Sequence, residues 1–594
     1  MTLPPLANVF AFSSPDPDLR DEVAADLLRS GSFAEVWRPH PQWVVAEAPL
    51  PDSPPTVEEA KRAGLVFVEG RNRLVGGAHP QEAVARLLDV LAAGPSRLAT
   101  LPGDFGLVQF RGDGSAFVAR SCAGRVPLYV WGDDTSVAIA TLQRDLVAHL
   151  PGKVEIDPLS QATWMTRWPL TVDDRTLVAG ARLLPSGHCC VVARARPATF
   201  ERYWDPRPER PAGASPASLA THAAQLRELL VSHLGEELDP DGRNVLSASG
   251  GVDSSSVGAL AVGPAQRPIS ITVSLVPPSD PVLAREMTWI TPLLDHLGVE
   301  RRDFLYGLPA VDRLYRETPP SFVPTIHPVL CRLTQLVEEA DVRTYVGGEF
   351  CDDLFGALRI HDWNEAVSPW QALRRTGKEP HGRGSVLRWA RDRAFRVLNR
   401  PILDAPSRLP EPVRASLQEE YAEWYRRRRR QFGSDKRPRR YVLERTPYGL
   451  SWIEMNWEIT SLLSVRRVFP FITRAMLELG AACHPHEVLA DGPKTLLRTG
   501  LKGDVPSRNL ERRDKGGWGR KSPRPPVAAP GTLPMEAAAI LEDAWLSPPD
   551  ECESRVAWPL LHLVRSLEQF HRLRSRGASG DPGCASSEGG NQND

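Results

Sequence analysis

The sequence predicts an α/β protein of two domains, a β-rich domain in front and a parallel sheet covered by helices behind it. Short apolar alternations such as 105–110 (FGLVQF), separated by Gly-Asp turns, recur through residues 1–205 and are typical of β-strands. After residue 216, strand and helix patterns alternate, which is typical of a parallel sheet. A chain of 594 residues is also too long for one compact core, so two large domains are expected.

A proline-rich, charged segment at residues 206–216 predicts a linker between these domains. The second domain covers residues 217–575, and its part after about residue 360 is expected to be mostly helical. Residues 576–594 are rich in Gly, Ser, Asp and Asn, which predicts a disordered tail. The elements expected before residue 360 are a helix at 217–235, strands at 244–248 and 269–276, a helix at 282–297 and a strand at 344–346. Ligands of parallel sheets bind at the carboxyl ends of the strands.

The composition is that of an ordinary soluble protein, with a net charge of −1. This charge gives no overall attraction to nucleic acid or to a membrane, so neither is expected as a partner. The eight cysteines include no C-x-x-C pair, and the N-terminus lacks the pattern of a secretory signal. No apolar run reaches the roughly 18 residues of a membrane span. A cytoplasmic location is expected.

The strongest local signal is the string Ser-Gly-Gly-Val-Asp-Ser-Ser at residues 249–255, directly after an expected strand and before a helix. Its glycines allow a sharp turn that brings backbone N–H groups close to a ligand, and a helix N-terminus favours an anion. Ser254 and Ser255 add hydroxyl donors, so the string predicts a pyrophosphate-binding nest. Asp253 suits an anion site only if a cation shares it, which implies Mg²⁺. A plain strand-to-helix turn is the alternative.

A second glycine-rich cluster lies at residues 346–356 (VGGEFCDDLFG), again between a strand and a helix. Its three closely spaced carboxylates would repel one another unless a cation lies opposite them. Acidic residues are also ordinary at a helix N-terminus. Because Asp253 is expected at a neighbouring strand end, we predict a magnesium ion shared by Asp253 and Asp352.

A third cluster, residues 512–518 (RRDKGGW), places Lys515 beside a glycine pair. A lysine there can reach into a cleft and offset negative charge on phosphate or carbonyl oxygens. A solvated basic loop is the alternative.

In this order, these motifs resemble those of the asparagine-synthetase superfamily, which includes asparagine synthetases, β-lactam synthetases and lasso-peptide cyclases. The resemblance covers most of the chain. It implies a front domain of the Ntn-type glutaminase fold, a β-sandwich like that of class II glutamine amidotransferases, and a back domain of the adenine-nucleotide α-hydrolase (PP-loop) type. The front-domain matches are residues 101–105, 124–129, 184–188 and 202–204.

The resemblance also implies roles for individual residues, with ATP and Mg²⁺ as cofactors. Asp253 and Asp352 would hold Mg²⁺, Glu349 would lie beside the reacting acyl group, and Lys515 falls on the catalytic lysine. The pyrophosphate loop would consist of Ser249, Gly250, Gly251, Asp253, Ser254 and Ser255, and the adenosine would be framed by Ser247, Val273, Gly347 and Gly348.

Two departures from the family pattern affect the expected chemistry. Glutamine-hydrolysing members begin with a cysteine nucleophile, whereas Thr2 follows the initiator methionine here and the nearest cysteine is Cys122. We therefore expect a degenerate glutaminase domain and an acceptor amine other than released ammonia. Arg466 and Thr473 stand where the family usually carries carboxylates around its Pro-Phe pair, so no acceptor-side catalytic residue can be assigned.

The expected function is ATP-dependent, AMP-forming amide-bond formation through an acyl-adenylate. A member without glutaminase activity looks most like a lasso-peptide cyclase. Such an enzyme joins the N-terminal amine of a precursor peptide to its own Asp or Glu side chain, with a leader-binding protein and a leader peptidase as further partners. A small-molecule amide or β-lactam synthetase, an asparagine synthetase using free ammonia, and a catalytically silent scaffold remain open.

Residues 426–440 carry nine basic side chains and one acid. They indicate either a solvated helix face or a docking surface for a peptide or partner protein.

Overall fold

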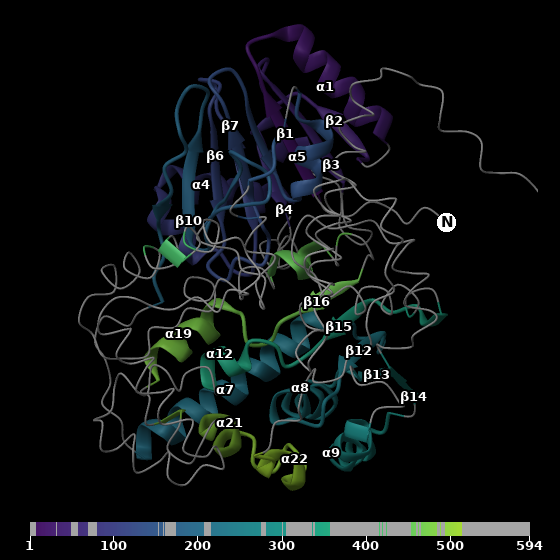
Figure 1. Ribbon diagram of the computed structural model, residues 1–594. Helices are drawn as coiled ribbons and strands as arrows, with labels where there is room; N and C mark the ends of the chain where they lie inside the picture. Colours follow the sequence, from purple (N-terminus) through teal and green to yellow (C-terminus); the bar gives the residue numbers. More distant parts are fainter. Residues whose placement is uncertain are drawn as a thin grey trace, which may run out of the picture.

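Figure 1 shows the computed structural model of the chain, with a β-rich front half above and a helix-covered sheet below. The described ranges leave out Thr2, most of the expected linker, the basic stretch 426–440, Lys515 and the expected tail. The structure describes residues 8–30, 33–48, 58–68, 80–151, 154–157, 160, 174–206, 216–274, 281–299, 301–304, 336, 339–356, 415, 418–419, 423, 453–458, 461, 465–483, 487–488 and 494–513.

The front half contains two antiparallel sheets, of six strands in the order β2-β3-β1-β8-β7-β9 and of five strands in the order β11-β10-β6-β5-β4. The first sheet comprises β1 (Asn8–Ser13), β2 (Glu35–Trp37), β3 (Trp43–Ala48), β7 (Tyr129–Gly132), β8 (Val137–Ala140) and β9 (Arg182–Leu183). The second comprises β4 (Leu65–Val68), β5 (Gly106–Phe110), β6 (Ala116–Arg120), β10 (His188–Val192) and β11 (Glu201–Arg202).

Alternation along the strands sorts their side chains into separate cores, because successive strand residues point to opposite faces of a sheet. Val9 and Ala11 of β1 pack with Val118 of β6 between the two sheets, whereas Phe10 and Phe12 point to the outer face. Helices cover both outer faces, so the front half has four layers. Over the first sheet lie α1 (Pro17–Ser30) and α5 (Gln143–His149), and over the second lie α2 (Glu58–Arg62), α4 (Pro80–Ala92) and η1 (Pro95–Thr100). The sequence analysis expected the strands but not these covering helices.

The back half is built on a five-stranded parallel sheet in the order β14-β13-β12-β15-β16. Its strands are β12 (Asn244–Ser247), β13 (Ile271–Ser274), β14 (Arg301–Phe304), β15 (Thr344–Val346) and β16 (Arg466–Val468). The α/β class with a parallel sheet is therefore confirmed. The strand order changes direction between β12 and β15, and the carboxyl ends of two strands at such a switch point form a natural crevice for ligands.

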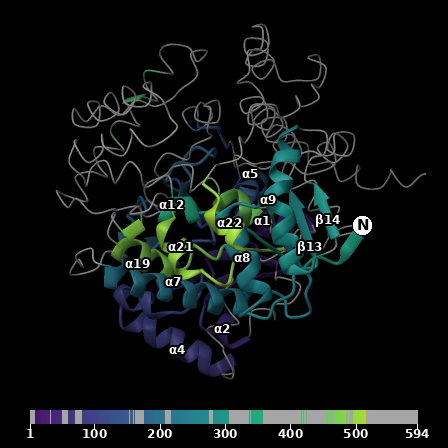
Figure 2. The ribbon, with the colours of Figure 1, turned by 90° about the horizontal axis from the view of Figure 1, so that it is seen from below.

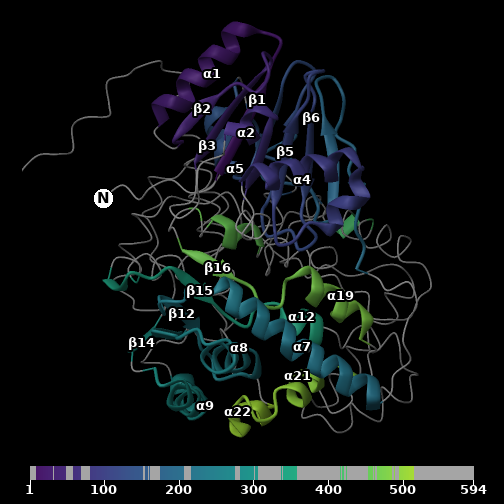
Figure 3. The same ribbon diagram turned by 180° about the vertical axis from the view of Figure 1, so that it is seen from behind.

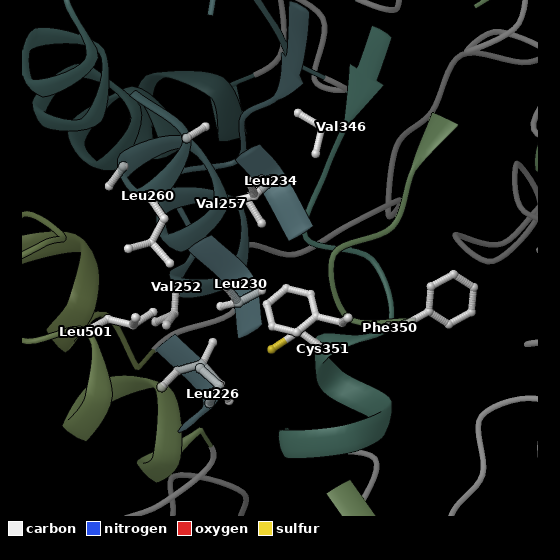
Figure 4. Close-up of a cluster of buried hydrophobic side chains, with 14 of the residues drawn as sticks. Leu226, Leu230, Leu234, Val252, Val257, Leu260, Val346, Phe350, Cys351 and Leu501 are labelled. Atoms are coloured by element: carbon white, nitrogen blue, oxygen red, sulfur yellow. The ribbon is translucent and has the colours of Figure 1, made fainter. Parts of the chain in front are cut away.

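The helices of the back half are α7 (Pro216–Glu237), α8 (Val252–Val262), α9 (Pro281–Leu297), α12 (Cys351–Phe355), α19 (Arg474–Ala482), α21 (Thr495–Gly500) and α22 (Ser507–Glu511). Helices α7 and α9 match the expected helices at 217–235 and 282–297. Helix α7 packs against α8, α19 and α21, as the views from below (Figure 2) and from behind (Figure 3) show. Their common core includes the side chains of Figure 4, among them Leu226, Leu230, Val257, Leu260 and Leu501.

Buried polar and aromatic side chains join the two halves. The Tyr129 hydroxyl donates to Glu454 Oε1 over 2.6 Å, and Trp457 packs into the core between the two front sheets. Trp204 Nε1 donates to Glu478 Oε1 over 3.1 Å. A segment of the back half thus inserts into the front half. Among the helices that the structure describes, none is both long and apolar enough to cross a membrane.

Candidate active site

The loop after β12 has a backbone that requires glycine. Gly250 has φ +64°, and a Cβ there would lie 2.7 Å from the backbone carbon of Trp289. Such a contact is too short for any other residue. Gly251 caps α8, and Ser254 Oγ lies 3.1 Å from Ser249 Oγ. The predicted pyrophosphate loop is therefore a tight, internally bonded turn at the switch point of the sheet.

The glycine pair after β15 brings the second predicted cluster against this loop. A Cβ on Gly348 would lie 2.5 Å from the Asp253 Cβ and 2.7 Å from the Ser254 backbone nitrogen. Phe350 holds a left-handed φ of 67° and packs edge-on against Phe469, with ring centroids 5.5 Å apart. This packing compensates the backbone strain that a non-glycine residue has in the left-handed region. The two loops are in contact, as the sequence analysis expected from their places at strand ends.

Lys494 lies between the two carboxylates that were predicted to share a magnesium ion. Its Nζ is 2.5 Å from Asp253 Oδ2 and 3.0 Å from Asp352 Oδ1. Burial by itself disfavours the charged ammonium, but the charges of Asp253 and Asp352 outweigh that effect and raise the pKa of Lys494. The lysine is therefore a resident cation of the site. The sequence analysis did not identify it.

Asp253 contacts this lysine through Oδ2 and has a second carboxylate oxygen, Oδ1. Its Oδ1 atom is buried and has no hydrogen-bond partner within the residues that the structure describes. A buried carboxylate oxygen without a partner is energetically costly, and a bound cation would relieve that cost. The geometry of Asp253 therefore fits a cation ligand.

Glu349, predicted to lie beside the reacting acyl group, pairs with Arg467 in the middle of the neighbouring strand β16. Arg467 Nη2 lies 3.3 Å from Glu349 Oε1, and the guanidinium stacks over Tyr345 at 3.9 Å from the ring centroid. The other carboxylate oxygen of Glu349 is buried without a hydrogen-bond partner in the described part of the chain. A basic residue thus faces Glu349 from β16.

Arg466 and Thr473, which depart from the family pattern, have structural roles outside the Glu349–Arg467 pair. Arg466 turns away and donates to the backbone carbonyl of Glu237, while Thr473 caps α19 by accepting from the Met476 backbone N–H over 3.2 Å. Arg467, one residue after Arg466, is the residue that reaches the site. Adjacent residues of a strand point to opposite faces, which explains the difference.

A layer behind the pyrophosphate loop holds it in place. Arg512 Nη1 donates to the Ser249 carbonyl over 3.1 Å, and its Nη2 donates to both carboxylate oxygens of buried Glu286, each at 2.8 Å. Asn509 donates to the carbonyls of Gly250 and Trp289 over 3.1 and 2.7 Å. Sequence reasoning missed these supports. Lys515, three residues beyond Arg512, lies outside the described residues.

The remaining predicted residues lie around the same edge of the sheet. Ser247 ends β12 and pairs in register with Val273 of β13, where the adenosine was expected. Gly347 follows β15, and the Glu349 carboxylate folds back over it, since a Cβ on Gly347 would lie 2.2 Å from Glu349 Oε2. Ser255 is fully buried in α8. Their ligand-binding roles stay predictions.

The fold and these loops define an α/β protein with two glycine-rich loops in contact at the switch point of its parallel sheet. A family model described as asparagine synthase matches residues 225–556, more than half of the chain. The chain belongs to the asparagine synthase family. Members are ATP-dependent ligases that form amide bonds, and this coarser part of the expected function is confirmed.

Two further comparisons add little. No curated protein matches the sequence. Among solved structures, the chain is similar to glutamine phosphoribosylpyrophosphate amidotransferase from B. subtilis complexed with ADP and GMP, at 11% identity and a TM-score of 0.22, with 50% of this chain and 90% of that chain covered. A similarity this low supports no conclusion about fold or function.

Proposed function

We propose that this chain closes a macrolactam in a precursor peptide by joining the peptide's N-terminal amine to an Asp or Glu side chain. The observation that carries the ATP-dependent half of the proposal is the Asp253–Lys494–Asp352 cluster beside the glycine loop. It supplies a cation and, in Asp253 Oδ1, a buried carboxylate oxygen without a hydrogen-bond partner among the described residues, in the loops whose sequences resemble the family's ATP site.

In the first half-reaction, a carboxylate oxygen of the peptide forms a bond to the α-phosphorus of ATP and pyrophosphate leaves. Backbone N–H groups of the glycine loop and the Lys494 ammonium offset the charge of the departing pyrophosphate. Asp253 and Asp352 would hold Mg²⁺, which would neutralise further phosphate charge.

In the second half-reaction, the amine attacks the acyl carbon, the acyl–phosphate bond breaks and AMP leaves. The amine must lose a proton in this step. Glu349 pairs with Arg467 through one carboxylate oxygen, and we assign to its second, buried oxygen the role of accepting that proton. Lys515 keeps its proposed role of offsetting charge on the acyl oxygen and AMP.

The front half supports an amine source other than glutamine. Its described cysteines, Cys122, Cys189 and Cys190, are all buried, and burial raises the pKa of each thiol to about 12. Thiols with such pKa values stay protonated near neutral pH and are poor nucleophiles. An intramolecular amine removes the need for a glutaminase. The same ATP half-reaction would also serve a small-molecule amide synthetase.

The test uses synthetic peptides that carry a free N-terminal amine and an Asp or Glu side chain several residues later, with ATP and Mg²⁺. The peptide should lose the mass of one water molecule and one AMP should form for each ring closed. Asp352→Asn should abolish both events, whereas Asp241→Asn, at an exposed turn, should change neither. Formation of AMP with hydroxylamine but no ring would support the ATP half-reaction and refute macrolactam closure.

A further inference from the structure

Three metal-ligating side chains meet in the back half between α7 and the end of α19, outside the site described above. His222 lies in α7, Cys483 caps the end of α19, and Glu487 follows four residues later. One ligand atom from each side chain lies within 4.8 Å of the other two, and His222 Nδ1 is 3.1 Å from Glu487 Oε2. Within the described residues this is the one such group.

Packing of the surrounding helices fixes the three residues relative to one another. Cys483 is completely buried in the core that α7 and α19 share, and its N–H donates to the Leu479 carbonyl over 3.0 Å. Glu487 is only 3% exposed and also accepts from Ser218, which lies one helical turn before His222 on the same face of α7. The packing of the core therefore holds the three side chains in place, and His222 is the one that is partly exposed.

The spacing fits a tetrahedral metal ion. Zinc–nitrogen and zinc–oxygen bonds of about 2.1 Å place the two atoms about 3.4 Å apart at the tetrahedral angle. The 3.1 Å between His222 Nδ1 and Glu487 Oε2 is close to that value, and the Cys483 sulfur lies within 4.8 Å of a ligand atom of each of these residues. Thiolate and imidazole ligands favour zinc over magnesium or calcium, which prefer oxygen.

We propose that His222, Cys483 and Glu487 bind one zinc ion, with water as the fourth ligand. The ion would tie α7 to the end of α19. Helix α19 contacts α12, which carries Asp352, and α7 contacts α21, which begins directly after Lys494. The zinc site thus braces the helices that position both sides of the carboxylate–lysine cluster. The proposal does not depend on which substrate the enzyme uses.

The test is the zinc content of the untagged full chain, purified from zinc-supplemented culture and dialysed against a weak chelator. Mass spectrometry of the metal should find about one zinc per chain in the wild type and below about 0.2 in Cys483→Ser and His222→Gln. Cys190→Ala changes a buried cysteine of the front half and serves as the matched control, because it should retain the metal.

Cobalt gives a second readout that does not depend on the measured zinc content. Replacement of zinc by Co²⁺ in the wild type should produce a thiolate-to-cobalt charge-transfer band, which Cys483→Ser should remove. Wild-type protein with less than about 0.2 zinc per chain and no such band would overturn the proposal. Retention of full zinc by both Cys483→Ser and His222→Gln would overturn it as well, by placing the metal elsewhere.

Discussion

Removal of the Lys494 ammonium tests the central electrostatic argument. In Lys494→Met the side-chain length is kept but the two acids lose their shared cation. Because Nζ lies 2.5 Å from one carboxylate oxygen and 3.0 Å from the other, these oxygens are at most about 5.5 Å apart. Two unit charges at that distance repel by about 3 kcal/mol at an effective dielectric constant near 20. Loss of one member of a buried ionic cluster commonly costs roughly 3–5 kcal/mol, so we expect about 3 kcal/mol less stability.

The response to magnesium should show whether Lys494→Met loses stability because its positive charge is missing or for another reason. A divalent cation between the carboxylates can replace the lost ammonium, so added MgCl₂ should stabilise Lys494→Met more than the wild type. At ten times the dissociation constant, binding contributes about 1.4 kcal/mol. The assay is urea unfolding followed by tryptophan fluorescence, with and without MgCl₂. Exposed Lys502→Met is the control and should match the wild type.

The contribution of Lys494 to stability should change with pH in a defined direction. The pKa of Lys494 is raised on folding above its ordinary value of 10.5, so its contribution is fully present below that value and is lost as pH rises through the folded pKa. The stability gap between the wild type and Lys494→Met should therefore be constant from about pH 7 to about pH 9 and shrink only in strong alkali. A gap below about 1 kcal/mol, or an equal response of both proteins to magnesium, would refute the reasoning.

Three further outcomes are expected at other positions of the chain. Gly348→Ala forces a Cβ against the Asp253 backbone and should weaken ATP binding at least about tenfold by calorimetry, whereas Gly112→Ala meets nothing within 4 Å and should bind normally. The purified chain should release no ammonia from glutamine in a coupled dehydrogenase assay, and release that stops in Thr2→Ala would contradict this. Tyr129→Phe removes the hydroxyl that donates to buried Glu454 and should cost about 1–3 kcal/mol of stability in thermal unfolding, and a loss below about 0.5 kcal/mol would mean that this bond does not join the halves.

Local sequence was sufficient for the parts of the fold that carry local signals. The strands near residues 244–248 and 344–346 are short apolar runs followed by glycines, and both are present as parallel neighbours. Their loops meet because carboxyl ends of parallel strands share one edge, so the proximity of Asp253 and Asp352 was predictable from topology. Strand β16 was not predicted, since three residues within a long stretch of helix-like pattern carry little periodic information.

The cations of the site could not be read from the sequence. Lys494 lies 241 positions from Asp253 along the chain, and only the packing of α21 against α7 and α8 brings them together. Arg467 was overlooked in favour of Arg466 because a shift of one residue along a strand exchanges the buried and outward faces. Arg512 was given no role of its own in the sequence, whereas its guanidinium is buried against Glu286. In each case the missing information was a long-range contact.

These long-range pairs share one electrostatic consequence. Around the two glycine loops, Lys494, Arg467 and Arg512 face four carboxylates, those of Asp253, Asp352, Glu349 and Glu286. These three basic side chains carry one charge less than these four carboxylates. A polyphosphate that entered alone would add negative charge to a partly buried site that already carries it, which is unfavourable where water screens poorly. A nucleotide that arrives with a divalent cation avoids this repulsion and gives the buried Oδ1 of Asp253 a partner. If this site binds ATP, as we propose, we therefore expect the metal–nucleotide complex to bind more tightly than the free nucleotide.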